Sequence, residues 1–380
     1  MSAQFESIKN KTVIGVFITN KHAAELTAMR PAFVSSSRYI RFIELAKANR
    51  DGDMVLYFFT RTTVNFPQKY VRGVYYDPRE NRWRQRRFPL PHLLYDRGGG
   101  LSPRSNPLIR RFRELGIKNI NARHFFDKWD LHHRLSRFSA IFPHLPATVK
   151  GEKASDALQM LHQHGSVYVK TRRGSSGVGV IRMEKLGPDG FRYYHSYGGQ
   201  LSSEILSKRE LAMLIDHYFA RRPFIIQKPI DLLKKGQGII DFRSEVQKNE
   251  KGRLVVAGTT ARIGRPHSPI ASHTRTEDYY PLEEFARSVL QLDAVKARQL
   301  KAKIHDFLHQ VFRGVEPAYG PFGEMGIDFG LDTGGKLWLI ECNSKSAKTA
   351  LYYAYGGEVV RQSFYTLLRY ARSLVRNQNY

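Results

Sequence analysis

Three polar residues near the end of the chain, Asp328, Glu341 and Asn343, have the types and spacing of a metal site. They lie in GIDFGLDTGGKLWLIECNSK, residues 326–345, where two strand-like runs flank Gly334 and Gly335. Adjacent glycines favour a two-residue hairpin turn, because glycine tolerates the positive φ angles that such a turn requires. With that turn, Asp328 faces Glu341 directly across the hairpin, and Asn343 points to the same side.

Two carboxylates held about 5 Å apart in this way repel each other unless one is protonated or a cation lies between them. Carboxylate and amide oxygens suit Mg²⁺, which usually completes its coordination with water and substrate phosphates. Two alternatives stay open: the acids are ordinary surface residues, or a three-residue loop shifts the register and separates them. The other face of the hairpin would pack in the core, with Ile327, Phe329, Leu331, Trp338 and Ile340.

A glycine-rich segment, VKTRRGSSGVGV at residues 169–180, could bind phosphate through its backbone N–H groups. Lys170, at the end of the preceding strand-like run, would add a positive charge. The segment is neither a Walker A loop nor a dinucleotide fingerprint, because no Gly-Lys-Ser/Thr occurs and a strand rather than a helix follows. The alternative is a mobile turn between two strands. The predicted loop comprises Gly174, Ser175, Ser176, Gly177, Val178 and Gly179.

Two arginines lie on the following strand-like runs, Arg243 in DFRSEV and Arg262 in TTARIG. The guanidinium fork binds phosphate or carboxylate through two hydrogen bonds, so both are candidate catalytic residues. Each could equally be half of a structural salt bridge. The lone cysteine, Cys342, directly follows Glu341 and so points to the opposite, core-facing side of the hairpin. It is expected to be a buried hydrophobic residue rather than a nucleophile.

Hydrophobic periodicity predicts the elements that position these residues. The β-branched and aromatic runs at 11–20 and 54–59 indicate strands, and residues 166–183 read as strand, glycine loop and strand. Strands are also expected at 223–230, 241–247 and 253–264. Helices are expected at 35–53, with serine caps, and at 208–220, 293–314 and 359–380.

Composition restricts the classes of protein that remain. The chain has 380 residues, 42% of them hydrophobic, and no apolar run of the roughly 20 residues that a membrane span needs. A single cysteine and the absence of a signal-like start agree with a reducing cytoplasm. The net charge of +27 favours an anionic partner. Its densest part, RENRWRQRR at residues 79–87, is either a nucleic-acid patch or, as we favour, a solvated strand edge protected by arginines.

The order of these features resembles the ATP-grasp superfamily and, more narrowly, the YheC/YheD endospore coat-associated proteins. The supporting phrases are FPLPHLLYDR, FDKWDLHHRL, LPATVK, KTRRGSSGVGV and the hairpin at 326–345, in which Asp328 and Glu341 are 13 residues apart. The resemblance implies an α+β fold in which two lobes clamp ATP. We expect a mixed α/β domain at 1–125 and an ATP-grasp domain at 126–380, with a glycine-loop lobe at about 150–225 and a metal-site lobe at 226–380.

The resemblance also implies further site residues. Lys128, in FDKW, would reach nucleotide phosphate, and Gln227, Lys228 and Ile230 would line the adenine site. Lys228 replaces an acidic residue common at this position. A larger departure lies at 269–281, PIASHTRTEDYYP, where Ser272 replaces an expected asparagine.

By this resemblance the leading hypothesis is an ATP-dependent carboxylate-amine ligase that uses ATP and Mg²⁺, or Mn²⁺ in its place, and acts through an acyl phosphate. Its carboxylate and amine substrates are unidentified, and polyanionic ones would suit the charge. Spore coat proteins are candidate partners, in the cytoplasm or at the coat. The altered segment 269–281 motivates an alternative, a catalytically silent nucleotide-binding component of the spore coat. A nucleic-acid-associated protein is the least favoured class.

Overall fold

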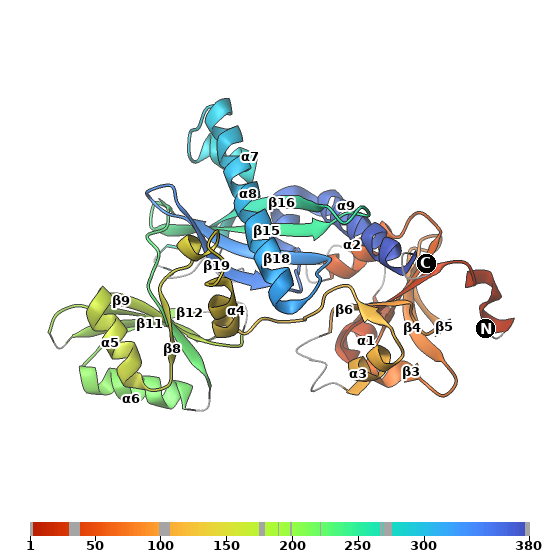
Figure 1. Cartoon of the computed structure of the whole chain (residues 1–380), viewed down its shortest axis with the longest axis horizontal. Helices are drawn as coiled ribbons and strands as arrows, with labels where there is room; N and C mark the ends of the chain where they lie inside the picture. The colour runs from red at the N-terminus through yellow and green to blue at the C-terminus, as the bar shows by residue number, and fades with distance from the viewer. Residues whose placement is uncertain are drawn as a thin grey trace.

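The computed structural model describes residues 3–376 apart from 30–38, 99–106, 175–178, 189, 198–199, 221, 267 and 269–275. The described residues form three sheets, each covered by helices (Figure 1). No helix in these described ranges is both long and apolar enough to cross a membrane.

The first sheet is mixed, in the order β3-β4-β2-β1-β6-β7, with β5 paired to β4. Its parallel centre reads as continuous apolar sequence because both faces are covered, and every residue of β1 and β2 is buried. The strand expected at 54–59 is β2. The strands are β1 Thr12–Phe17, β2 Met54–Phe59, β3 Val64–Asn65, β4 Tyr70–Asp77, β5 Arg82–Pro89, β6 Leu93–Asp96 and β7 Lys118–Asn119.

The helices around this sheet are η1 Ala3–Ile8, α1 Asn20–Ala28, α2 Ile40–Ala48, η3 Arg61–Thr63 and α3 Pro107–Glu114. The helix expected at 35–53 is therefore shorter. It begins after Tyr39, which makes no side-chain cap, so the expected serine cap is wrong for this helix, and the serines themselves lie outside the described residues.

The basic segment 79–87 forms the β4–β5 turn and most of β5, which pairs with β4 at the edge of the sheet. Trp83 points away from the exposed face that the arginines form. It is buried and lies edge-on against Phe58. The exposed face of this strand is therefore mainly guanidinium groups, which agrees with a charged, protected edge.

The second sheet is antiparallel, in the order β12-β11-β10-β9-β13-β8, and one of its faces packs against α5 and α6. The strand, loop and strand expected at 166–183 are β9, the glycine segment and β10. The elements are β8 Thr148–Gly151, α5 Ala154–His164, β9 Ser166–Thr171, β10 Val180–Lys185, β11 Phe191–Tyr197, β12 Gln200–Leu206, α6 Lys208–Phe219 and β13 Phe224–Gln227.

The third sheet, in the order β17-β16-β15-β18-β19 with β14 beside β15, carries the hairpin of the opening motif. The apolar face of α8 packs on it, so Ile304, Leu308 and Val311 share a core with Phe329. The elements are α4 Lys128–Leu135, η4 Phe142–His144, β14 Lys234–Lys235, β15 Gly238–Lys248, β16 Leu254–Gly264, β17 Thr276–Pro281, α7 Leu282–Ser288, α8 Ala294–Tyr319, β18 Glu324–Leu331, β19 Leu337–Asn343 and α9 Thr349–Arg376.

Helix α9 connects the first and third sheets (Figure 1). Its Val360, Phe364 and Leu367 belong to the same core as Phe42 and Ile43 of α2. The division at residue 125 stays a prediction, but the last helix of the chain completes the core of the first sheet. The second part of the segment 269–281 is strand β17, while residues 269–275, with Ser272, lie outside the described residues.

Candidate active site

A cavity of about 630 Å³ lies between the second and third sheets and is lined by residues of both. Residues separated by more than 200 positions meet there, since α4, β9, β13, β15, β16, β18 and β19 all contribute. Gly179 does not line this cavity but is buried against Thr171, which does. Ser175, Ser176, Gly177 and Val178 lie outside the described residues. The predicted site residues that line it are Lys128, Lys170, Gly174, Gln227, Lys228, Ile230, Arg243, Arg262, Asp328, Glu341 and Asn343.

Asp328 faces Glu341 as expected, although the predicted two-residue turn is wrong. Leu331 pairs with Leu337, and the N–H of Asp332 donates to the carbonyl of Lys336 at 3.0 Å, so the loop has three residues. Such a loop alone would have separated the two acids. A bulge after Asp328 restores the pairing, because β19 contains one extra residue at this point.

The three-residue loop explains a second correction, because it places Leu337 rather than Trp338 opposite Leu331. Leu337 and Leu339 are buried in the core, whereas Trp338 and Ile340, expected there, are only partly buried. Ile340 instead lines the cavity. Cys342 beyond the bulge is buried as expected, and desolvation raises the pKa of its thiol, so it is a poor nucleophile.

Asp328 is held by three side chains, from strands β15, β16 and β19. Arg243 Nη1 donates to its Oδ2 at 2.8 Å, Arg262 Nη2 to its Oδ1 at 2.9 Å, and Asn343 Nδ2 to its Oδ2 at 2.8 Å. Both arginines therefore face the cavity and also form ion pairs, which joins the two alternatives left open by the sequence. Arg262 binds Asp241 through two further hydrogen bonds of 2.6 and 2.9 Å.

Asp241 is buried behind Arg262, and this burial affects its ionisation. Burial raises the pKa of its carboxyl to about 6, against the opposing effect of Arg262. Charged groups can lie this deep because each has a partner of opposite sign.

Glu341 has a different partner, Lys128 at the start of α4. Lys128 Nζ lies 3.0 Å from Glu341 Oε1 and donates to the carbonyl of Gly174, also at 3.0 Å. Helix α4 begins there because Asp127 caps its N-terminus, accepting hydrogen bonds from the N–H groups of Trp129 and Asp130. Lys128 thus connects the hairpin that carries Glu341 to the glycine segment.

Lys170 and Gln227 lie side by side on β9 and β13. Lys170 Nζ donates to Gln227 Oε1 at 2.6 Å, while Gln227 Nε2 donates to Thr148 Oγ1 at 3.0 Å. Both ends of this amide are therefore engaged, so Gln227 orients Lys170. Desolvation, with a smaller contribution from the charge of Lys128, lowers the pKa of Lys170 to about 8.

The hairpin fits a hard divalent cation. Within the described ranges no group of three or more His, Cys, Asp or Glu side chains could hold a metal ion. The hairpin offers two carboxylates and an amide instead, beside a cavity with room for a phosphate-bearing ligand. Mg²⁺ is often bound by one or two carboxylates and completed by substrate phosphates.

Sequence reasoning missed several charged residues behind the site. Glu245 is two residues beyond Arg243 on β15, so period-two alternation could have placed it on the same face. Lys348 and Glu324 gave no local signal, because their ion pair at 2.9 Å forms between distant segments.

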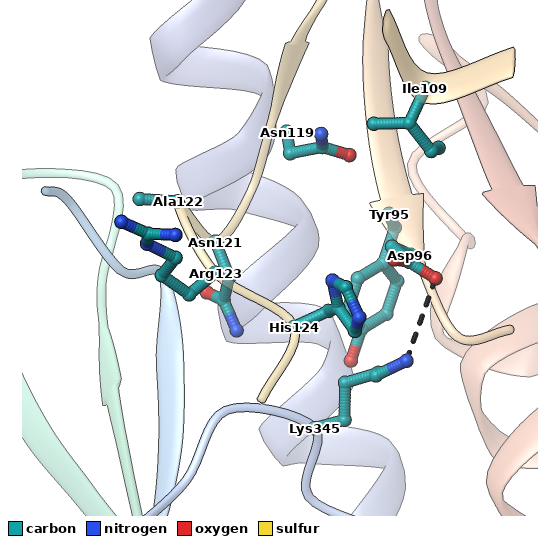
Figure 2. A pocket seen from close by; sticks show the side chains of 9 residues that line it. All are labelled: Tyr95, Asp96, Ile109, Asn119, Asn121, Ala122, Arg123, His124 and Lys345. Atoms are coloured by element: carbon teal, nitrogen blue, oxygen red, sulfur yellow. Dashed lines mark ion pairs between the residues drawn. The ribbon is translucent and has the colours of Figure 1, made fainter. Parts of the chain in front are cut away.

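A second, much smaller cavity adjoins the first sheet, and Lys345 lines both cavities. Figure 2 shows Lys345 pointing to Asp96, with His124 and the Tyr95 ring beside it. The volume of this second cavity, about 20 Å³, is enough for one water molecule and too small for a substrate.

Comparison with known proteins identifies the family. Residues 116–374 match the family described as YheC/D-like ATP-grasp. The chain belongs to this family. It is 24% identical over 326 residues to the endospore coat-associated protein YheD of Bacillus subtilis (strain 168), covering 82% of this chain and 69% of YheD. The corresponding values for YheC of the same strain are 22% over 312 residues, 81% of this chain and 85% of YheC.

The ATP-grasp fold also appears among solved structures. D-alanyl-alanine synthetase A from Vibrio cholerae O1 biovar eltor str. N16961 has a TM-score of 0.55 at 14% identity, over 94% of this chain and 99% of that enzyme. The resemblance to the ATP-grasp and YheC/YheD proteins and the expected fold are thereby confirmed, while the roles of the individual site residues stay predictions.

Proposed function

We propose that this YheC/D-like ATP-grasp protein is an ATP-dependent carboxylate-amine ligase. The observation that carries the proposal is the convergence of Lys128, Lys170, Arg243 and Arg262 with Asp328, Glu341 and Asn343 on one cavity. Four cations suit the phosphates of a nucleotide, and the carboxylate and amide oxygens suit Mg²⁺.

The proposed reaction has two steps. A substrate carboxylate oxygen forms a bond to the γ-phosphorus of ATP, and the bond from that phosphorus to ADP breaks. The nitrogen of an amine then attacks the acyl carbon, phosphate leaves with the bonding pair, and the nitrogen loses a proton to solvent. No protein nucleophile is required.

The chain's residues would bind and orient these groups. Lys128, Lys170 and the glycine segment would hold the phosphates, while Arg243 and Arg262 would stabilise negative charge on the transferred group. Asp328, Glu341 and Asn343 would hold Mg²⁺, which when bound neutralises phosphate charge. The main chain at Lys228 and Ile230, which line the same cavity, would contact adenine.

Glu341→Ala tests this assignment directly. We expect ADP release with Mg²⁺ and a panel of carboxylates and amines to fall at least a hundredfold while the far-UV spectrum and melting temperature stay close to wild type. Glu284→Ala, an exposed acid on α7, serves as the control. Unchanged ADP release in Glu341→Ala would remove the metal assignment.

A silent nucleotide-binding role is the second candidate. The observation in its favour is that both acids proposed as metal ligands already have cationic partners, Lys128 for Glu341 and two arginines for Asp328. Calorimetry with ATP and Mg²⁺, set beside the ADP-release assay, distinguishes the two. Binding without release under every substrate pair would favour the silent role.

Association with the endospore coat, from a cytoplasmic site of synthesis, is part of the same proposal. Its support is the description of two curated relatives as endospore coat-associated proteins. The charge of +27 favours acidic substrates or coat partners.

A further inference from the structure

A buried series of alternating charges runs from the first sheet to Asp328. It starts just after β6, passes through the first residue of β18 and the segment before α9, and ends on β15 and β18. Its members, in order, are Arg97, Glu324, Lys348, Glu245, Arg243 and Asp328.

The first part joins the first sheet to the third. Arg97 Nη1 lies 3.2 Å from Glu324 Oε1 and donates to the Tyr95 hydroxyl, which itself donates to Glu324. The Arg97 and Glu324 side chains are 4% and 1% exposed, so water contributes little to their solvation. Arg97, Lys348 and the Tyr95 hydroxyl hold the pKa of Glu324 below its usual value despite burial.

Lys348 lies at the middle of the series. Its Nζ is 2.9 Å from Glu324 Oε2 and 3.8 Å from Glu245 Oε2, and its side chain is fully buried. The ammonium group also lies 5.0 Å from the centre of the Phe364 ring on α9. One buried cation thus separates two buried carboxylates on neighbouring strands.

The last part reaches the proposed metal ligand. Glu245 Oε1 accepts from Arg243 Nε at 3.1 Å, which leaves Arg243 Nη1 directed at Asp328 Oδ2. Ser346 also connects Lys348 to Arg243, because its Oγ accepts hydrogen bonds from the N–H of Lys348 at 3.1 Å and from Arg243 Nη2 at 3.4 Å.

Other contacts fix the same junction. Asn121 Nδ2 donates to the carbonyl of Glu324 at 3.1 Å. Lys345, two residues after Asn343, forms an ion pair of 3.7 Å with Asp96 at the end of β6, as Figure 2 shows. The first sheet is therefore bound to β18 and to the segment that follows β19.

We propose that Lys348 is a positioning residue, which holds Arg243 against Asp328 through Glu245 and so couples the first sheet to the metal-binding hairpin. This inference rests on the metal assignment of the proposed function. Because two buried carboxylates face Lys348, its loss leaves Glu245 with Arg243 as its remaining cation, and the guanidinium group moves toward Glu245. Asp328 then loses a hydrogen bond that fixes its orientation.

The test measures metal binding rather than turnover. Mn²⁺ is titrated into the full-length protein saturated with the non-hydrolysable analogue AMP-PNP, and free Mn²⁺ is followed by electron paramagnetic resonance. Lys348→Met should weaken Mn²⁺ binding about tenfold, while metal-free AMP-PNP affinity, set mainly by Lys128 and Lys170, changes less than about twofold. Lys348→Arg, which keeps the charge, should restore most of the affinity.

Lys248→Met is the matched control. Lys248 is on β15, as are Glu245 and Arg243. It forms an ion pair of 2.5 Å with Glu316 and lies 5.9 Å from the Phe312 ring, but these contacts do not lead to Asp328. This variant should lose stability and keep its Mn²⁺ affinity. If Lys348→Met does not fold, Tyr95→Phe, which removes a hydrogen bond to Glu324 without changing charge, should weaken Mn²⁺ binding about threefold.

The outcomes separate the inference from the function. If the wild-type protein and folded Lys348→Met bind Mn²⁺ with equal affinity, the positioning role alone is overturned. Unchanged Mn²⁺ affinity in Tyr95→Phe would have the same consequence. Wild-type protein that bound AMP-PNP but no Mn²⁺ would overturn both the metal assignment and this inference. Absence of ligase turnover with the expected Mn²⁺ pattern would overturn the ligase proposal and leave the inference standing.

Discussion

The guanidinium group of Arg243 occupies the space beside Gly326 that any larger residue would fill. A Cβ atom at position 326 would overlap the Nη2, Cζ and Nε atoms of Arg243. Gly326 pairs with Glu245 on the neighbouring strand, so the glycine lets Arg243 cross its backbone to reach Asp328. Its lack of a side chain is therefore a requirement of the site.

Gly326→Ala should displace Arg243 and disturb Asp328. We expect the free energy of unfolding to fall by about 1–3 kcal/mol through overpacking, and Mn²⁺ affinity with AMP-PNP to fall about tenfold. Chemical denaturation and the Mn²⁺ titration measure the two effects. Gly314→Ala on α8, whose added methyl would overlap Ile141, should match the effect on folding without the loss of metal affinity. Equal metal affinity in both variants would contradict the role of Gly326.

Lys128 connects Glu341 to the glycine segment, so Lys128→Met should affect metal and nucleotide in opposite directions. Removing its charge leaves Glu341 free of a competing cation, and Mn²⁺ affinity without nucleotide should rise about threefold. AMP-PNP affinity should fall about tenfold, because a phosphate contact is lost. Calorimetry measures both, with Lys150→Met, whose partner Glu152 is exposed, as control. A fall in metal-only affinity would show that Lys128 supports Glu341 rather than competing for it.

The pKa of Lys170, lowered to about 8, predicts a pH dependence of nucleotide binding. Below pH 8 the ammonium form is present and can pair with phosphate. Above pH 8 the free protein has lost this proton, so binding must first restore it, and affinity should fall up to about tenfold per pH unit. Proton uptake near pH 8.5, measured by calorimetry in buffers of different ionisation enthalpy, should disappear at pH 6.5 and in Lys170→Met. A flat affinity from pH 7 to 9 would argue against the shifted pKa.

The exposed arginines of β5 should keep the sheet edge from pairing with another chain. Arg86 stacks on Phe88 at 4.7 Å and Arg87 on Tyr70 at 4.7 Å, each with its charge at the surface. Replacing both with threonine, a strand former without charge, should increase self-association in light scattering and leave AMP-PNP binding unchanged. The same double change at Arg110 and Arg111 on α3 is the control. If the β5 variant self-associates no more than the wild-type protein, the protective role is excluded.

If these arginines instead bind nucleic acid, a different result is expected. Binding of nucleic acid would weaken steeply with salt, in proportion to the number of phosphates neutralised. Retention of any such binding in the threonine variant, or a shallow salt slope, would exclude this surface as the binding site.

The local sequence pattern was sufficient to predict those helices and strands that depend on residues close together in the chain. The apolar run at 54–59 became β2, and the spacing of Ile304, Leu308 and Val311 placed α8 against a sheet. The same reasoning correctly put Asp328 opposite Glu341, although the predicted two-residue turn is wrong. The three-residue loop shifts the register by one residue, and the bulge shifts it back.

The partners of the charged residues came only from the tertiary structure. Lys128 and Glu341 are 213 positions apart, and Arg97 and Glu324 are 227 apart. Sequence periodicity acts over a few residues and carries no information on which distant strands become neighbours. Periodicity therefore could identify the acids of the hairpin and the two strand arginines, but not which cation pairs with which acid.

The sequence by itself determined the composition of the site: hard oxygen ligands on a hairpin, a lysine before a glycine loop, and two strand arginines. Folding decided the distances, the engagement of Gln227 by Lys170, and the series of buried charges that ends at Asp328. The physical reason is that side-chain chemistry is local, whereas desolvation and ion pairing depend on which surfaces are brought together when the sheets pack.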